Sequence, residues 1–154
     1  MGVDGPVEAP IAVRTAAELS STLRLAVMRL SRRLRSQRSE ELESLPAPQV
    51  GALATLVRHG TLALHELAQY EGVRPPSMNR IVGQLEERGL VERMAHPTDR
   101  RQVLFAPTRE GRALIKEDRR RRDAWLAQRL RELTPRERET LRAAAPVLEK
   151  LTNL

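Results

Sequence analysis

The sequence predicts a mainly α-helical chain with one β-hairpin, and three observations lead to this fold class. Arg, Leu and Ala dominate the composition, whereas aromatic residues make up 2% of it, and this balance favours helices over sheets. Apolar residues recur at three- and four-residue steps over most of the chain, which is the period of amphipathic helices. Residues 90–95 and 102–106 instead have the extended pattern of two strands, joined by a short polar turn.

The 154 residues are enough for one compact lobe with helical arms. Residues 1–14 contain Gly and Pro without periodicity, which predicts a flexible tail. The lobe is expected to span residues 46–108. Residues 15–38 and 109–152 are expected to form the helical arms.

The first helix is predicted to begin at Thr15 and to end near Arg38. Thr15 and Glu18 have the spacing of a capping box, in which each side chain satisfies a backbone amide of the other residue. An apolar stripe follows, and Arg residues occupy the other face of the helix. The stripe consists of Leu19, Leu23, Val27, Leu30 and Leu34.

Three helices are predicted in the first part of the lobe. A short apolar helix begins after Pro46 and Pro48 and ends at Gly60, because Gly tolerates the left-handed backbone of a helix end. A second covers residues 64–71. The third opens at the two prolines that follow Arg74 and runs to Gly89.

Two more helices are predicted after the hairpin. Thr108 caps a long helix over about residues 109–132, and Thr134 begins a second capping box that starts the terminal helix. Pro146 lies inside the terminal helix and cannot donate to the carbonyl of Arg142, so a kink is expected there. The whole order predicts about six helices and one hairpin.

The chain is strongly basic, with 27 basic residues, 20 acidic residues and a net charge of +7. All the basic residues except Lys116 and Lys150 are arginine. A balance of this kind favours an acidic partner such as nucleic acid, although charge alone does not identify the partner.

Several classes of chemistry are excluded by the residues present. The chain has no Cys, which rules out disulfides, thiolate catalysis and cysteine redox sensing. His59, His65 and His96 are scattered and lack metal-ligand spacing, so no metal and no cofactor are expected. No nucleophile is paired with a His, no Gly-rich phosphate loop is present, and the adjacent Glu86 and Glu87 point apart on a helix. The protein is therefore not expected to be an enzyme.

No apolar run approaches the ~20 residues of a membrane span, so no membrane association is expected. The start of the chain lacks a basic segment followed by an apolar one, which is the pattern of a secretion signal. A cytoplasmic location is expected.

The segment from residue 64 to residue 89 has the pattern of a helix-turn-helix. Ala68 is small enough to let two helices cross closely, and Gly72 can adopt the left-handed backbone of a sharp turn. Val73 is an apolar plug after the turn. Ile81, Val82 and Leu85 then form the buried face of the second helix. In this motif the second helix is available to the major groove of DNA.

The exposed face at the start of that second helix carries side chains that suit base recognition. Arg80 can donate two parallel hydrogen bonds to guanine, and Asn79 can pair in a similar way with adenine. Ser77 can reach a base edge or a phosphate. Pro76 lies on the same face, and the positive end of the helix dipole points towards the DNA backbone. The alternative is that these residues are solvated surface.

The hairpin tip carries Asp99, Arg100 and Arg101, and a basic tip of this kind can enter the minor groove. Asp99 is expected to hold one Arg side chain in place through a charge-assisted pair. The alternative is a solvated turn with a surface ion pair of little energetic value.

From Leu67 to Gly111 the chain resembles the MarR (multiple antibiotic resistance regulator) family of winged helix-turn-helix regulators. The resemblance extends over about residues 16 to 152 when the helical ends are included. The matching features are LAQYEGV, SMNRIVGQLEERGLVER, the Asp-x-Arg of Asp99 and Arg101, and Thr108 followed by Glu110-Gly111.

The resemblance implies a DNA-binding transcription regulator, with repression as the expected outcome. It implies that Ser77, Asn79 and Arg80 contact DNA from the recognition helix. Arg101 corresponds to the wing arginine that enters the minor groove, with Asp99 as its partner. Arg100 is an added positive charge of undefined role.

The start of the recognition helix departs from the family pattern. Many members begin this helix with a Ser or Thr cap, whereas this chain has Arg74 followed by Pro75 and Pro76. Two prolines remove two amide donors, so fewer caps are needed and fewer backbone contacts to phosphate are available. Arg74 is expected to supply a side-chain contact in their place, and an Arg74→Ala variant with unchanged DNA affinity and salt dependence would reject this hypothesis.

The helical arms have apolar stripes that the lobe cannot cover, which predicts a homodimer. Packing within one chain is the alternative. By resemblance, the dimer places two recognition helices one turn of DNA apart on a near-palindrome. The expected interface residues are Leu19, Leu23, Trp125, Leu126, Leu141, Leu148 and Leu151.

The resemblance also implies a small effector, often aromatic and anionic, that binds between the arms and the lobe and weakens DNA binding. Tyr70, His59 and Trp125 could line such a pocket, although core or surface roles suit them as well. The four residues Arg119–Arg122 could touch phosphate, but the acidic neighbours favour a solvated helix face.

Two further functions remain open at this stage. A winged helix can serve as a protein–protein interaction module, which would need neither a basic wing tip nor an Arg and Asn on the exposed face. Sequence-nonspecific DNA binding would give equal affinity for scrambled DNA and a strong dependence on salt.

Overall fold

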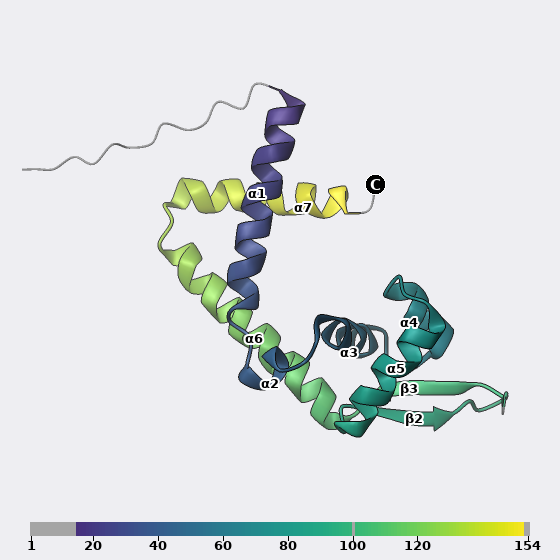
Figure 1. Ribbon diagram of the computed structural model, residues 1–154. Helices are drawn as coiled ribbons and strands as arrows, with labels where there is room; N and C mark the ends of the chain where they lie inside the picture. The colour runs from purple at the N-terminus through teal and green to yellow at the C-terminus, as the bar shows by residue number, and fades with distance from the viewer. Residues whose placement is uncertain (1–14, 100, 153–154) are drawn as a thin grey trace, which may run out of the picture. The chain divides into compact units, whose positions relative to one another are not determined.

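The computed structural model describes residues 15–99 and 101–152 (Figure 1). The predicted tail, residues 1–14, and the wing residue Arg100 lie outside the described residues. The chain divides into two compact units, Met1–Ser36 and Gln37–Leu154, and each is described by itself.

The described part of the first unit is one long helix, α1 (Ala16–Arg35). The predicted capping box is present, since Thr15 Oγ1 accepts a hydrogen bond from the Glu18 amide at 3.2 Å and the Glu18 carboxylate accepts one from the Thr15 amide at 3.1 Å. Basic residues occupy the last turn, where they interact favourably with the negative end of the helix dipole. No residue of α1 is buried, and most of its large apolar side chains, such as Leu19, Val27 and Leu30, are exposed in the protomer.

The second unit holds the remaining elements (Figure 1). In chain order they are α2 (Glu40–Glu43), α3 (Ala47–His59), β1 (Leu62–Ala63), α4 (Leu64–Tyr70), α5 (Pro75–Glu87), β2 (Val91–Ala95), β3 (Val103–Pro107), α6 (Arg109–Arg131) and α7 (Pro135–Leu151). The mainly helical fold with a hairpin is therefore confirmed. The short elements α2 and β1 were not expected from the sequence.

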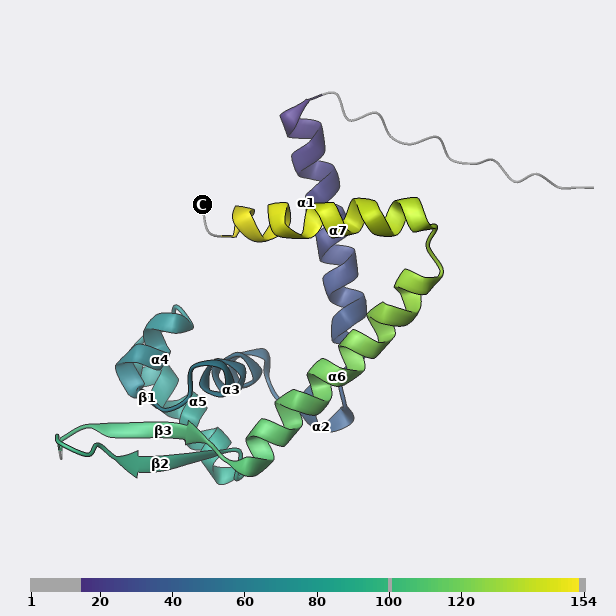
Figure 2. The same ribbon diagram turned by 180° about the vertical axis from the view of Figure 1, so that it is seen from behind.

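A small antiparallel sheet supports the hairpin. Its strand order is β1-β3-β2, and Phe105 on the central strand lies opposite Leu62 on one side and Arg93 on the other. Figure 2 shows the hairpin projecting from the helices of the lobe. We call β2, β3 and the described residues between them, 96–99 and 101–102, the wing.

One hydrophobic core holds the helices of the lobe together and extends beyond the predicted residues 46–108 into α2 and α6. Each fully buried Leu or Met contributes about 1.5–3 kcal/mol relative to an exposed one, so this core is the main source of stability. Its members with no exposed surface are Leu42, Ala52, Leu53, Leu56, Leu67, Met78, Val82 and Leu85.

The start of α6 is tied closely to the turn between α5 and β2. The Thr108 hydroxyl donates to the Gly89 carbonyl at 2.7 Å and accepts from the Gly111 amide at 3.1 Å, which confirms the predicted cap. A Cβ at Gly111 would lie 2.2 Å from the backbone oxygen of Leu90. A residue without a side chain is therefore required where α6 crosses this turn.

The terminal helix begins as expected. The Thr134 hydroxyl accepts from the Glu137 amide, and the Glu137 carboxylate accepts from the Thr134 amide at 2.7 Å. The Glu137 carboxylate also accepts from the Thr134 hydroxyl at 2.7 Å, and this hydrogen bond first, then the one from the Thr134 amide, lowers the pKa of Glu137. Helix α7 continues through Pro146 to Leu151, and the kink at Pro146 stays a prediction.

Candidate nucleic-acid interface

The turn between α4 and α5 has the geometry of a helix-turn-helix. Gly72 has a φ of 63°, the left-handed backbone that the sequence predicted, and the Val73 amide donates to the Ala68 carbonyl at 3.0 Å. Val73 packs against the core. These contacts fix the direction in which the chain leaves α4 and enters α5.

Side chains of helix α3 hydrogen-bond to the end of α4 and to α5. The Thr55 hydroxyl donates to the carboxylate of Glu71, the residue that ends α4. A Cβ at Gly51 would lie 2.5 Å from that carboxylate, so the absence of a side chain at Gly51 makes room for it. In addition, the Gln49 side-chain amide donates to Gln84 Oε1 at 2.8 Å, which joins α3 to α5.

Helix α5 separates a buried face from an exposed face, as expected for a recognition helix. Met78, Ile81, Val82 and Leu85 are buried in the lobe. The predicted contact residues Arg74, Pro76, Ser77, Asn79 and Arg80 are all exposed. The structure thus presents these side chains to solvent on one side of the helix.

The start of α5 has an unusual set of donors. Arg74 is the N-cap, no side chain caps the helix, and Pro75 and Pro76 occupy the first two positions. The Met78 amide already donates to the Arg74 carbonyl at 3.1 Å. Among residues 75–77, Ser77 alone has a backbone N–H, since prolines have none. This N–H and the Ser77 hydroxyl are both available for an external acceptor.

The wing tip is organised by Asp99. Its carboxylate accepts from the Arg101 backbone amide at 3.0 Å and from the Gln102 side-chain amide at 3.2 Å, and its carbonyl accepts from the Gln102 amide at 3.0 Å. The sequence suggested a pair between Asp99 and an Arg side chain. In the described part of the wing the contact instead runs through the backbone of Arg101.

A second arginine joins the wing to the recognition helix. Arg93 on β2 forms an ion pair with Glu86 on α5 at 3.2 Å, and its guanidinium lies 5.3 Å from the centre of the Phe105 ring. Phe105 is buried and lies opposite Arg93 in the sheet. Arg93 is therefore held between an acidic side chain and an aromatic ring, with about half of its side chain exposed.

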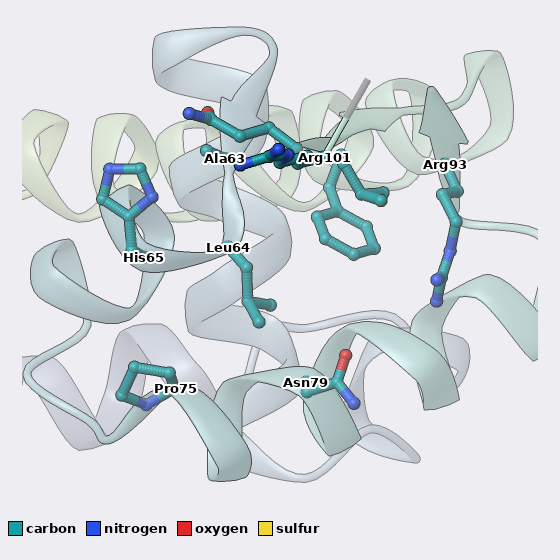
Figure 3. Close-up of a pocket in the computed structure, with 10 residues that line it drawn as sticks. Ala63, Leu64, His65, Pro75, Asn79, Arg93 and Arg101 are labelled. Atoms are coloured by element: carbon teal, nitrogen blue, oxygen red, sulfur yellow. The ribbon is translucent and has the colours of Figure 1, made fainter. Parts of the chain in front are cut away.

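The recognition helix and the wing line one hollow of about 330 Å³ (Figure 3). Its lining combines positively charged and polar side chains with apolar ones. We call it the helix–wing hollow. Its lining residues are Ala63, Leu64, His65, Pro75, Asn79, Arg93, Arg101, Gln102, Val103 and Phe105.

The hollow brings together two of the predicted contact residues, Asn79 and Arg101, and adds three that the sequence did not single out. His65 is exposed in the first turn of α4, and Gln102 follows Arg101 in the wing. Arg93 is the third. The alternation of strand β2 could have indicated that Arg93 shares a face with Val91, but only the sheet register shows that it lies against Phe105.

The predicted interface residues of the arms remain at least partly exposed in the protomer. No residue of α7 is buried, as in α1. The structure adds apolar surface that was not predicted, such as Leu25, Met28 and Val147. Of the predicted set, the exposed residues are Leu19, Leu141, Leu148 and Leu151, and the half-buried ones are Leu23, Trp125 and Leu126.

The Arg run on α6 is mostly engaged with its acidic neighbours. Arg120 and Arg121 donate to the Glu117 carboxylate at 2.8 Å and 3.0 Å. These hydrogen bonds lower the pKa of Glu117 to about 2, and the bond from Arg120 has the larger effect. Arg122 pairs with the buried Asp118. This arrangement fits a helix face with internal ion pairs.

The described residues contain neither a metal-binding group nor a membrane-spanning helix. No group of His, Asp and Glu side chains within residues 15–99 and 101–152 is arranged to hold a metal ion. No helix in the same ranges is long and apolar enough to span a membrane.

Comparison with known proteins bears directly on this lobe. The model of the MarR family matches residues 45–103. An HTH-type transcriptional regulator of Mycobacterium tuberculosis is 45% identical over 137 residues, which are 89% of this chain and 94% of the relative. The HTH-type transcriptional repressor MdtR of Bacillus subtilis is 30% identical over 134 residues, covering 86% of this chain and 85% of the relative.

Solved structures agree with the sequence comparison. The crystal structure of RV1404 from Mycobacterium tuberculosis has a TM-score of 0.83 and 28% identity, covering 92% of this chain and 97% of the other. A MarR family protein from Bacillus stearothermophilus has a TM-score of 0.76 and 25% identity, covering 94% and 100%. A relative with 45% identity spans 89% of the chain, and the family model covers α5 and the wing as far as Val103. The chain therefore belongs to the MarR family of winged helix-turn-helix regulators, which bind DNA to control transcription.

Proposed function

We propose that the protein is a homodimer that recognises a near-palindromic operator through α5 and the wing of each protomer. One observation carries the proposal: the exposed face of α5 and the tip of the wing line the same hollow, through Asn79 and Arg101. A helix in a major groove and a wing in the adjacent minor groove need this side-by-side arrangement.

Base recognition is assigned to the exposed face of α5. Arg80 is free to donate two hydrogen bonds to guanine O6 and N7, and Asn79 can pair with adenine N6 and N7. Pro76 presents apolar surface beside them, which suits a thymine methyl group or a sugar. Support comes from the exposure of all three residues on a helix whose opposite face is buried.

Backbone contacts are assigned to Ser77 and Arg74. The amide and hydroxyl of Ser77 can both donate to one phosphate, at the positive end of the α5 dipole. Pro75 and Pro76 have no backbone N–H to donate to a phosphate. Arg74, the exposed N-cap, can contact the phosphate with its charged side chain instead.

The wing is assigned to the minor groove. Arg101 is exposed at the tip, and its backbone is anchored by Asp99. Arg is favoured in narrow minor grooves because the negative potential is enhanced there. Arg100 lies outside the described residues, and we propose only that its positive charge contributes to DNA binding.

Dimerisation is assigned to the arms, because both terminal helices keep apolar side chains exposed. Leu148 and Leu151 on α7 and Leu19 on α1 are among these. Apolar surface of this extent marks an interaction site on a protein that functions in water. A Leu148→Asp variant should show a lower molar mass by light scattering, and an unchanged dimer would place the interface elsewhere.

Binding to the DNA upstream of the protein's own coding sequence tests operator recognition. The parent should bind this fragment at least about 10³-fold more tightly than a scrambled fragment at equal salt. The Arg80→Ala variant should lose about 1–3 kcal/mol and relax the preference at one base pair. Equal affinity for scrambled DNA would instead favour sequence-nonspecific binding, and no DNA affinity would favour a protein–protein interaction module.

We further propose that the protein represses transcription and is released by a small aromatic or anionic effector. Repression is supported by the relative named as a repressor in Bacillus subtilis, and effector release by the family resemblance alone. Since a bacterial repressor acts on chromosomal DNA, this proposal also predicts a cytoplasmic location. Loss of operator binding on addition of members of a library of aromatic carboxylates tests the release, and an unaffected complex counts against it.

A further inference from the structure

The turn of the wing is closed by the imidazole of His96. The Nδ1 atom of His96 accepts a hydrogen bond from the Asp99 amide at 3.0 Å and another from the Thr98 amide at 3.3 Å. The Thr98 hydroxyl lies 3.3 Å from the same nitrogen. The backbone amide of His96 donates across the hairpin to the Gln102 carbonyl, also at 3.3 Å. One ring nitrogen thus accepts hydrogen bonds from two consecutive backbone amides.

The contacts of His96 continue into those of Asp99. The His96 ring fixes the amide of Asp99, and the Asp99 carboxylate in turn accepts from the amide of Arg101 at 3.0 Å. The position of Arg101 along the wing therefore depends on a relay of two side chains. Both relay residues are half-buried, whereas Arg101 is exposed.

We infer that His96 is a positioning residue for the wing: its neutral imidazole, with the proton on Nε2, acts as an amide acceptor that sets the conformation from which Asp99 presents Arg101. An Nδ1 atom that accepts two N–H groups needs its lone pair, so it cannot carry a proton in this arrangement. The effect on DNA binding rests on the proposed function, whereas the effect on the wing itself does not.

Two substitutions separate the acceptor from the bulk of the side chain. In His96→Asn, the amide oxygen occupies the same bond position as Nδ1 and can accept the same two N–H groups, as Asn does in an Asx-turn. In His96→Leu, the side chain also branches at Cγ, but it has no hydrogen-bond acceptor. The two variants form a matched pair, because neither retains the ring.

The first experiment uses the free protein. Relaxation of the ¹⁵N amides should give order parameters near about 0.85 at Thr98, Asp99 and Arg101 in the parent and in His96→Asn, but below about 0.6 in His96→Leu. The imidazole ¹⁵N spectrum should report an unprotonated Nδ1 at neutral pH. Equal order in all three proteins, disorder in both variants, or a protonated Nδ1 would overturn the inference.

The second experiment measures DNA affinity at constant salt. His96→Asn should bind the operator within about twofold of the parent, and His96→Leu should bind about tenfold more weakly, which corresponds to the loss of one or two hydrogen bonds. Affinity of His96→Leu equal to that of the parent would overturn the role of His96 in presenting Arg101. If the parent binds no DNA, the proposed function fails, and the order parameters still decide whether His96 positions the wing.

Discussion

Glu86 on the recognition helix and Arg93 on the first strand of the wing form an ion pair, with 3.2 Å between the carboxylate and guanidinium groups. The pair joins the two elements assigned to DNA contact. It lies beside the helix–wing hollow, which Arg93 lines. Arg93 therefore pairs with an acidic side chain of α5 while it lines the surface that we assign to DNA contact.

Glu86→Gln should leave the free energy of unfolding within about 1 kcal/mol of the parent, because exposed ion pairs contribute little. It should also release Arg93 towards DNA, so the salt dependence of binding should steepen by about one phosphate contact. The logarithm of the affinity, measured against the logarithm of the salt concentration, gives this slope.

The matched control for Glu86→Gln is the same change in an Arg93→Ala background, where it should have no effect on the slope. An identical slope in the parent and in Glu86→Gln would show that Arg93 does not contact phosphate.

Arg101→Ala should weaken binding most on DNA with a narrow minor groove, because Arg gains from the enhanced negative potential there. Affinities for two operators, one with A-tracts beside the half-sites and one with G·C pairs in their place, make the comparison. If both operators lose affinity equally, Arg101 contacts phosphate and does not enter the minor groove.

Gly111→Ala should destabilise the protein by about 1–3 kcal/mol, because the new Cβ would meet the Leu90 carbonyl oxygen and force the start of α6 to shift. Gly83→Ala is the matched control, since no atom lies within 4 Å of a Cβ at that helical position. It should be neutral or stabilising by up to about 1 kcal/mol. Denaturant unfolding measures both, and equal effects would contradict the close approach at Gly111.

The Glu117 carboxyl should titrate near pH 2, because hydrogen bonds from Arg120 and Arg121 lower its pKa to about 2. A lowered carboxyl pKa means that the interaction stabilises the folded protein above the ordinary value of 4.5 and is lost as pH falls towards 2. Carboxyl ¹³C shifts followed against pH give the midpoint. In the double variant Arg120→Gln, Arg121→Gln the midpoint should return towards 4.5. A midpoint that does not move would contradict this assignment of the two hydrogen bonds.

Much of the lobe could be predicted because its local chemistry and its packing agree. Gly72 provides the left-handed backbone that the turn needs. Ile81, Val82 and Leu85 form the buried stripe of the helix that begins at the two prolines. The caps at Thr15, Thr108 and Thr134 could also be predicted, because a cap depends on residues three apart in the sequence.

The elements that escaped prediction are the shortest. Strand β1 has two residues, which cannot show an alternating pattern, and it exists because β3 offers a free edge. Helix α2 has four residues, with Ser39 as its cap and Leu42 as its one buried side chain. Tertiary contacts decide both elements.

The site could be predicted only in part. The exposed face of α5 follows from helical periodicity, but the roles of Arg93, His65 and His96 depend on which strands and turns are neighbours in space. Asp99 illustrates the limit, since the sequence indicated an anchoring acid at the tip but not that its carboxylate holds the Arg101 backbone.

Selection of bound fragments from random duplex DNA tests the central claim most directly. Two copies of α5 on one duplex predict a motif with two-fold symmetry, whose half-sites lie about 10–10.5 base pairs apart from centre to centre. Enrichment of such a motif by the parent, with one position per half-site relaxed in Arg80→Ala, is the expected result. An asymmetric motif, or no enrichment over the starting pool, would contradict the account.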